Sequence, residues 1–277
     1  MSAGLMNLVF PQWQGSGKRK YLYHGAELVR GLLPPGASYV EIPVSLDEDL
    51  RVEHGVFGYR EIRDQLARAS DAVMNARPDK IFLIGGDCGT EVAPVSYLNQ
   101  RYGGDLAVLW LDAHGDLNSP STSVTGNFHG MPLRCLLGDG DPALVARSFS
   151  TLRPEQVLMG GLRELDPPER EFIDETGIHV LTVGDLEGDP GCVSRLVAEK
   201  GFRNVYVHID LDVLDSGKCP WALCLTPDGI DTAVLMALLR DLRAKVSLAG
   251  ISIVELRPAE GVDLHPLKEL VNFCSQI

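Results

Sequence analysis

The pattern of hydrophobic positions predicts strands that alternate with helices. Short apolar runs rich in β-branched residues are separated by longer segments in which apolar residues recur at helical spacing. We expect helices at Gly58–Asn75, Val92–Gln100, Pro167–Thr176, Val193–Lys200 and Asp231–Arg243. We expect strands at Leu5–Phe10, Ser38–Pro43, Lys80–Ile84, Leu106–Asp112, Gln156–Met159, His179–Leu181, Asn204–Asp210 and Leu248–Glu255.

The composition of these strands indicates how the sheet is covered. Runs such as IFLIG (81–85) and LAVLWLD (106–112) are apolar nearly throughout, which is typical of strands buried on both faces. Alternation of strands and helices favours a parallel sheet with helices on each side. We therefore expect an α/β protein, a three-layer α/β/α sandwich with a central, mainly parallel sheet of about eight strands. No repeat or linker divides the chain, so residues 1–277 are expected to form a single domain.

Charge and cysteine content narrow the function classes. The chain has 277 residues with 25 Lys+Arg against 38 Asp+Glu, a net charge of −13. This balance argues against nucleic acid or an anionic membrane as partner and fits a small cationic substrate or acids gathered around a metal. No apolar run is long enough for a transmembrane helix, and the N-terminal basic cluster follows the apolar stretch, unlike a secretory signal. Six scattered cysteines without a CxxC motif indicate reduced thiols in a cytoplasmic protein.

Acidic residues stand at the ends of four predicted strands. They are Asp87, Asp112, Asp210 and Glu255. The carboxyl ends of parallel strands meet at one edge of a sheet, where ligands bind. Carboxylates gathered there repel one another and lose hydration, so a divalent metal that neutralises them is the simplest explanation.

Two motifs place ligands at alternate positions. If the strand stays extended past Asp112, then His114 and Asp116 leave from the same face. Asp210 and Asp212 repeat this spacing on another strand, and Cys88 or Asp87 adds a ligand from a third. One six-coordinate ion does not need so many carboxylates, whereas two ions about 3.5–4 Å apart would use them all. Carboxylates with imidazole favour manganese, magnesium or similar ions over a zinc site rich in thiolates.

The order of the motifs resembles that of the arginase/agmatinase (ureohydrolase) superfamily. Its patterns are GGDH, DAHxD, SGNxHG, DxD and a terminal Glu. Here they stand as GGDC (85–88), DAHGD (112–116), TGNFHG (125–130), DLD (210–212) and VEL (254–256). The resemblance runs from about Gly85 to Pro258. Its largest departure is Cys88, which stands where the family has a histidine ligand.

The resemblance implies a hydrolase of guanidino compounds with two Mn²⁺ per chain. A hydroxide that bridges the two ions attacks the guanidinium carbon, and urea and an amine are released. By position, the implied ligands are Asp112 and Asp210 for both ions, Cys88 and Asp116 for one ion, and His114 and Asp212 for the other.

The resemblance also implies catalytic roles. Glu255 would pair with the guanidinium, His129 would transfer protons, and Asp116 acts with them as a catalytic residue. Each has a simpler alternative. His129 lies in a Gly-rich loop and could cap a backbone group, while Glu255 could form an ion pair with Arg257 or Arg163.

The loop after Asp116 resembles the stretch of arginases that binds the α-carboxylate of the substrate, and the later segment GLRELDPPER (161–170) resembles the one that holds the α-ammonium. Asn118, Thr125 and Asn127 match the carboxylate positions, and Asp166 and Glu169 match the ammonium positions. Such groups would be left unpaired by agmatine, which lacks a carboxylate. We therefore expect L-arginine or a close analogue as the small cationic guanidino substrate. Ordinary loop chemistry is the alternative reading.

Two departures leave alternatives open. A Cys88 thiolate is soft and manganese is hard, so the site binds metal weakly, prefers Zn, Fe or Co, or holds Mn while raising the pKa of its bound water. The last case favours Nω-hydroxy-L-arginine, whose guanidine is less basic. Agmatine or another guanidino acid, and a non-catalytic arginase-like binding protein, are further alternatives. Cys224 replaces a common Thr, and His208 is expected to be a core histidine. A homo-oligomer is compatible with the sequence but is not specified by it.

Overall fold

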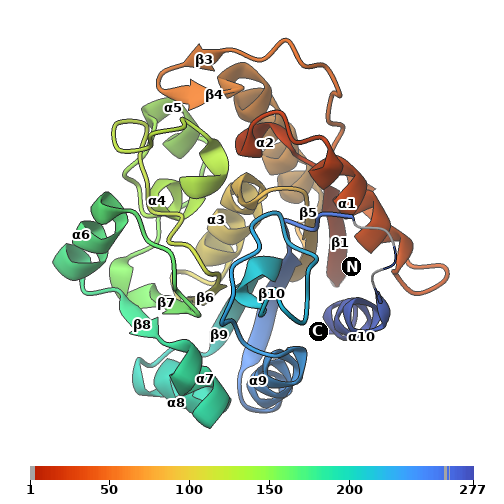
Figure 1. The fold of residues 1–277 in the computed structure, drawn as a ribbon, viewed down its shortest axis with the longest axis vertical. Coiled ribbons are helices and arrows are strands. Elements are labelled where there is room, and N and C mark those ends of the chain that lie inside the picture. Colours follow the sequence, from red (N-terminus) through yellow and green to blue (C-terminus); the bar gives the residue numbers. More distant parts are fainter. Residues whose placement is uncertain (1–3, 259–260, 262) are drawn as a thin grey trace.

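A single parallel sheet forms the centre of the computed structural model, which describes residues 4–258, 261 and 263–277 (Figure 1). Its strand order is β2-β1-β5-β10-β9-β6-β7-β8, and every pairing is parallel. The last strand in sequence, β10, lies between β5 and β9 and so joins the two halves of the sheet. The strands are β1 Leu5–Phe10, β2 Val40–Glu41, β5 Lys80–Gly85, β6 Ala107–Leu111, β7 Val157–Gly160, β8 His179–Leu181, β9 Asn204–Ile209 and β10 Ser247–Ile253; β3 Val52–Glu53 and β4 Val56–Phe57 form a separate hairpin.

Helices cover both faces of the sheet. On one face, apolar residues of α2 to α5 pack against Val108 and Trp110 of β6; on the other, α1 and α7 to α10 pack against Leu109 and Leu111. Successive strand residues point to opposite faces, so each face needs its own apolar layer. The helices are α1 Tyr21–Gly31, α2 Tyr59–Ala76, α3 Val92–Arg101, α4 Pro132–Leu136, α5 Pro142–Val145, α6 Pro167–Thr176, α7 Val183–Gly188, α8 Cys192–Glu199, α9 Thr232–Lys245 and α10 His265–Cys274. The predicted three-layer α/β/α sandwich is confirmed.

Several predicted boundaries were wrong. The strand expected at 38–43 is only the exposed pair Val40–Glu41, at the edge of the sheet. The strands expected to reach Asp112, Asp210 and Glu255 end one or two residues earlier, at Leu111, Ile209 and Ile253. Apolar pattern does not mark these ends, because the acids follow directly on a buried run.

Helix α1 was not predicted, and it bears on the site. A Cβ on Gly25 would lie 1.9 Å from the carbonyl oxygen of Leu256, so only glycine lets the helix approach this backbone. The residue before Leu256 is Glu255, and α1 therefore packs directly beside a predicted catalytic side chain. Glycine lowers helix propensity, which hid this helix from the sequence pattern.

Four neighbouring central strands, β5, β10, β9 and β6, end at the same rim. The segments after them carry Cys88, Glu255, Asp210 and Asp112 respectively. None of the helices in the described part of the chain has the length and apolar character needed to cross a membrane.

Candidate metal centre

The first ligand motif leaves the sheet instead of continuing the strand. β6 ends at Leu111, and the backbone turns so that Asp112 Oδ1 accepts a hydrogen bond from the His114 amide at 2.6 Å. Asp116 adopts a left-handed backbone with φ of +53°. The extended geometry expected for this motif was therefore wrong. The three side chains gather nonetheless, because the turn folds them back over the rim.

The second ligand motif is also a turn. Asp210 begins a short 3₁₀ helix, η5 (Leu211–Val213), and its Oδ1 accepts the Asp212 amide at 2.8 Å. Asp212 Oδ1 in turn accepts the amide of Ala113 at 3.0 Å, which ties the second motif to the first. These backbone hydrogen bonds hold the carboxylates in place before any metal binds.

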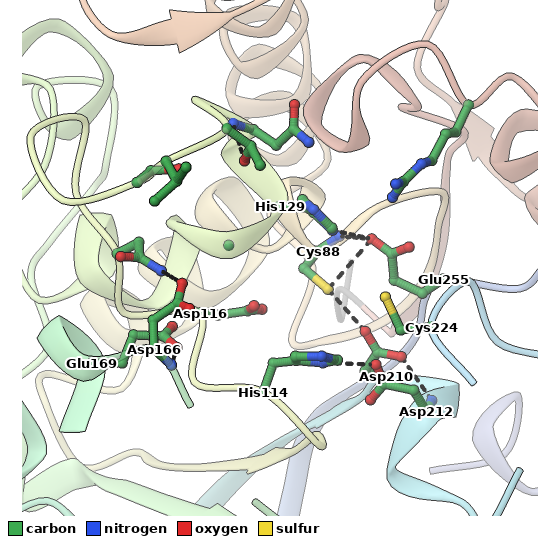
Figure 2. A pocket seen from close by; sticks show the side chains of 17 residues that line it. Cys88, His114, Asp116, His129, Asp166, Glu169, Asp210, Asp212, Cys224 and Glu255 are labelled. Atoms are coloured by element: carbon green, nitrogen blue, oxygen red, sulfur yellow. Dashed lines mark hydrogen bonds and ion pairs between the residues drawn. The ribbon is translucent and has the colours of Figure 1, made fainter. Parts of the chain in front are cut away.

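The structure brings the six predicted ligands together in overlapping groups. Figure 2 shows all of them except Asp112 around the pocket. Within each group, one donor atom per residue lies within 4.8 Å of all the others. Asp112 and Asp210 meet Asp212 in one group, so the two predicted bridging residues are adjacent. The groups are Cys88, Asp112, Asp116 and His208; His114, Asp212 and Cys224; Cys88, Asp210 and Glu255; and Asp112, Asp210 and Asp212.

Asp87, the alternative ligand, is not among these groups in the part of the chain that the structure describes. Its Oδ1 accepts the Gly89 amide at 3.0 Å and begins the turn η2 (Cys88–Glu91). The sequence left the choice between Asp87 and Cys88 open, and the geometry selects Cys88.

Burial and mutual repulsion dominate the electrostatics of the centre. Burial, together with Asp112 and Glu169, raises the pKa of Asp116 well above its usual range. Burial and the charges of Asp212 and Asp112 do the same to Asp210. A cation at this rim would relieve both effects, because it stabilises the charged form of each carboxyl.

The thiol and the imidazole at the centre respond to the same acids. Burial and the nearby carboxylates raise the pKa of Cys88 well above that of a free thiol. Burial alone would lower the pKa of His114, but hydrogen bonds to Asp112 and Asp212 outweigh it and raise that pKa. The nearest of these contacts joins His114 Nδ1 to Asp212 Oδ2 at 2.9 Å. Without a cation, bound protons therefore neutralise part of the negative charge of these acids.

Unpartnered polar atoms support a fit between this donor set and metal ions. Among the described residues, buried atoms without a hydrogen-bond partner include Asp116 Oδ2, Glu255 Oε2 and His208 Nε2. A buried polar atom without a partner costs about 1–3 kcal/mol, so three at one rim indicate a missing group. Carboxylate, imidazole and thiolate donors all suit divalent ions.

Glu255 and His129 face each other across the centre. Glu255 Oε1 lies 3.3 Å from His129 Nδ1 and accepts the Cys88 amide at 3.3 Å. The ion pairs of the described residues join Glu255 to neither Arg163 nor Arg257, so that alternative is not supported. Arg163 instead donates to backbone carbonyls, among them that of Asp212 at 2.7 Å.

A cavity of about 330 Å³ opens above the metal ligands. Its wall includes every residue predicted to bind the amino-acid end of the substrate, namely Asn118, Thr125, Asn127, Asp166 and Glu169. Three further lining residues are Arg19, Cys224 and Val124. Arg19 lies in a stretch without a recognisable motif, so the sequence offered no signal for it. Cys224 had been noted only as a departure from a common threonine.

The predicted ammonium-binding residues already have hydrogen-bond partners. Glu169 is buried, and its two oxygens accept the amides of Leu117 and Asp166, each at 3.0 Å. Asp166 Oδ2 accepts from the Asn118 side chain at 3.0 Å. Glu169 therefore fixes the start of α6 against the ligand loop, and Asp166 presents the more accessible carboxylate.

Comparisons with known proteins agree with this geometry. The protein-family model described as "Arginase family" matches residues 32–264 of the chain. The chain is similar to an arginase of Staphylococcus aureus (strain MSSA476), with 30% identity over 241 residues, 84% of this chain and 80% of that protein. It is also similar to an arginase of Bacillus subtilis (strain 168), with 31% identity over 236 residues, 82% and 74% of the two chains. A structure of Entamoeba histolytica arginase with L-ornithine shares the fold, with a TM-score of 0.82 at 20% identity over 99% and 98% of the chains.

The fold and the rim of buried acids define an α/β protein with a candidate metal centre at the carboxyl end of its sheet. The chain belongs to the arginase family, as the family match over residues 32–264 shows. It is therefore a hydrolase of carbon–nitrogen bonds in linear amidines.

Proposed function

We propose that the chain, as one arginase-like domain, hydrolyses the guanidino group of L-arginine or a close amino-acid analogue with two Mn²⁺ ions. Asp112 and Asp210 would hold both ions, with Cys88 and Asp116 on one side and His114 and Asp212 on the other. The observation that carries the proposal is the convergence of these six side chains from three segments at one rim. When bound, the two ions supply a hydroxide near neutral pH, because they lower the pKa of water.

The residues around the ligands position the guanidinium group. Glu255 presents a buried carboxylate whose Oε2 has no partner among the described residues, and it is suited to accept guanidinium N–H groups. The Cys88 amide holds the other oxygen at 3.3 Å. Because Glu255 is fixed by the backbone next to the metal ligands, it orients the guanidinium carbon toward them.

Two side chains are suited to move protons. Asp116 Oδ2 is buried and has no hydrogen-bond partner among the described residues, so it is placed to accept the proton that the attacking water loses. His129 lies 3.3 Å from Glu255 and is only half-buried, so it can exchange protons with both the substrate and solvent. We assign it the transfer of a proton to the leaving amine.

The outer wall of the cavity would bind the amino-acid end. Asn118, Thr125 and Asn127 offer hydrogen-bond donors to an α-carboxylate, and Asp166 offers a carboxylate to the α-ammonium. Glu169 contributes by positioning Asp166 and Leu117, since both of its oxygens are engaged. A substrate that lacks the α-carboxylate and the α-ammonium would leave the hydrogen-bonding side chains of this wall without partners.

Nω-hydroxy-L-arginine is the second candidate, and Cys88 is the observation that favours it. Cys88 Sγ lies 3.2 Å from Asp210 Oδ2 and 3.8 Å from Glu255 Oε1. A thiolate at this position therefore adds negative charge beside the attacking water. Added negative charge raises the pKa of that water. A substrate with a less basic guanidine tolerates such a change better than L-arginine.

The test combines metal analysis with a comparison of substrates. The purified chain is loaded with Mn²⁺, desalted and analysed for metal, and urea or hydroxyurea release is measured with L-arginine, Nω-hydroxy-L-arginine and agmatine. We expect about two ions per chain and activity on an amino-acid guanidine but not on agmatine. Failure to bind metal, with no product from any of the three, would support the non-catalytic alternative.

A further inference from the structure

We propose that His208 is a seventh metal ligand, positioned by Glu91, and that it supplies the imidazole missing at Cys88. This inference rests on the proposed metal-dependent function. His208 was predicted to be a core histidine, because it lies two residues before Asp210 on the buried strand β9. Its burial is confirmed, but its surroundings are those of a ligand.

The distal nitrogen of His208 points at the first metal group. The ring is fully buried, and Nε2 has no hydrogen-bond partner among the described residues. It shares a group with Cys88, Asp112 and Asp116, whose donor atoms all lie within 4.8 Å of one another. Metal–nitrogen and metal–sulfur bonds of about 2.0–2.3 Å span such a group with only a small adjustment.

The aspartate beside Nε2 does not explain the orientation of the ring. Asp112 Oδ2 lies 3.7 Å away, which is too long for a hydrogen bond. A histidine buried only for packing would be expected to use both nitrogens, because each unpartnered nitrogen costs free energy. An ion between His208, Cys88 and the two aspartates would satisfy this nitrogen.

Glu91 fixes the proton on the other side of the ring. Its Oε1 lies 2.8 Å from His208 Nδ1, and its Oε2 accepts the Tyr206 hydroxyl at 2.6 Å. A carboxylate at Nδ1 holds the proton there and leaves the lone pair on Nε2. A carboxylate, a histidine and a metal in this sequence are the usual arrangement around histidine ligands.

A neighbouring indole prevents the ring from turning away. Trp110 is the register partner of His208 on β6, and the two rings stack with centroids 3.7 Å apart and planes at 19°. The indole Nε1 also donates to Asp112 Oδ2 at 3.3 Å. The same side chain therefore orients two members of the metal group.

The arrangement also compensates for the cysteine. Position 88 supplies a thiolate where the family's motif supplies an imidazole, and His208 returns an imidazole to the same group from the adjacent part of the rim. The resulting donors, one sulfur, one nitrogen and carboxylates, favour a borderline ion more than the usual set does.

X-ray absorption on the metal-loaded, unmodified chain tests the inference without any substitution. Zn²⁺ or Co²⁺ is the probe, and the scattering pattern counts the imidazoles bound to metal. We expect two imidazoles, His114 and His208, with one sulfur. A single imidazole would overturn the role of His208.

Substitutions provide the second test. His208→Asn keeps a donor near Glu91 and removes the distal nitrogen, so affinity for one of the two ions should fall at least tenfold while the other is unchanged. Adding Cys88→His to this variant should restore that affinity. Glu91→Gln changes only the residue that positions His208, and it should lower the affinity for the same ion by a smaller factor.

The outcomes separate this inference from the proposed function. If the unmodified chain binds two ions and His208→Asn binds both with unchanged affinity, His208 is a core residue and only this inference fails. If the unmodified chain binds no ion, the metal-dependent function itself is wrong. Circular dichroism of each variant shows whether a loss of metal accompanies a loss of fold.

Discussion

The floor and the outer wall of the cavity are built differently. The floor consists of acids at strand ends, and Asp112, Asp210 and Asp212 are each at most 3% exposed and tied to backbone amides. The outer wall is a loop in which Thr125 is exposed and Val124 is 96% exposed. A rigid floor suits chemistry that tolerates little displacement, while an exposed loop can change without disturbing the fold. The proposed roles therefore assign the reaction and the choice of substrate to separate regions.

The largest effect should follow from damage to the floor. Asp116→Ala and Asp212→Ala each remove a ligand, and we expect each to abolish measurable turnover and to reduce bound metal. Elemental analysis and a urea assay measure both. Asp215→Asn, in the same segment but outside the metal groups, is the matched control and should keep both. An Asp116 or Asp212 variant with full metal and full activity would contradict the ligand assignment.

Glu255 separates substrate positioning from metal binding within the floor. Glu255→Gln keeps the shape of the side chain but loses the charge that pairs with the guanidinium. We expect kcat/KM to fall about tenfold to a hundredfold, since a hydrogen bond to a charged group contributes about 1.5–3 kcal/mol. Metal content should not change. Loss of metal along with activity would instead make Glu255 a ligand.

Substitution of Cys88, the thiol at the floor, should change metal affinity by a smaller amount. Cys88→His replaces a soft donor with one that suits manganese better, so Mn²⁺ affinity should rise by about tenfold. Isothermal titration of the metal-free chain measures this, with Cys135→Ser, a buried cysteine away from the rim, as control. Unchanged or weaker Mn²⁺ binding would count against Cys88 as a ligand.

The pH dependence of stability distinguishes the metal-free floor from the loaded one. Burial and nearby acids raise the pKa of Asp116 and Asp210 and raise that of Asp212 to about 6, so the folded state binds these protons more tightly than the unfolded chain does. Such groups lower stability as pH rises from about 4, the ordinary value, through the folded pKa. The raised pKa of His114 acts in the same direction, because its stabilisation is complete below its ordinary value of 6.5 and is lost above it.

The metal-free chain should therefore have a lower melting temperature at pH 8 than at pH 6. Metal binding requires the deprotonated ligands, so Mn²⁺ should raise the melting temperature more at pH 8 than at pH 6. Differential scanning calorimetry with and without Mn²⁺ measures both. Equal Mn²⁺ stabilisation at the two pH values would show that the acids at the rim are not the groups that bind.

The smallest effects should come from the outer wall. Thr125→Ala and Asn127→Ala each remove one hydrogen bond to the α-carboxylate at a wall open to solvent, where water replaces part of it. We expect a loss of about 1 kcal/mol, so KM for the amino-acid substrate should rise about fivefold with kcat unchanged. Ser121→Ala, on the same loop but not lining the cavity, should leave KM unchanged. A fall in kcat instead of a rise in KM would place these residues in the chemical step.

Much of the fold could be predicted because the strands are continuous apolar runs. The convergence of the six candidate metal ligands could be predicted because their motifs follow buried strands whose carboxyl ends meet at one rim. Their geometry could not, since each strand ends in a turn where extended backbone was expected, and Asp212 is tied to Ala113 by a hydrogen bond across 99 positions. Alternation gave the side of the sheet on which His208 lies and its burial in the core, but its pairing with Glu91 is a contact across 117 positions that the sequence does not indicate.

The position of β10 has a consequence for how the molecule comes into being. This strand is synthesised after every other strand of the sheet, yet it occupies the middle of the sheet between β5 and β9. A chain still lacking it has two half-sheets with no shared edge, and it also lacks Glu255, the carboxylate proposed to bind the guanidinium. The proposed activity therefore requires the chain to extend past Glu255, and truncation before β10 should remove that activity completely.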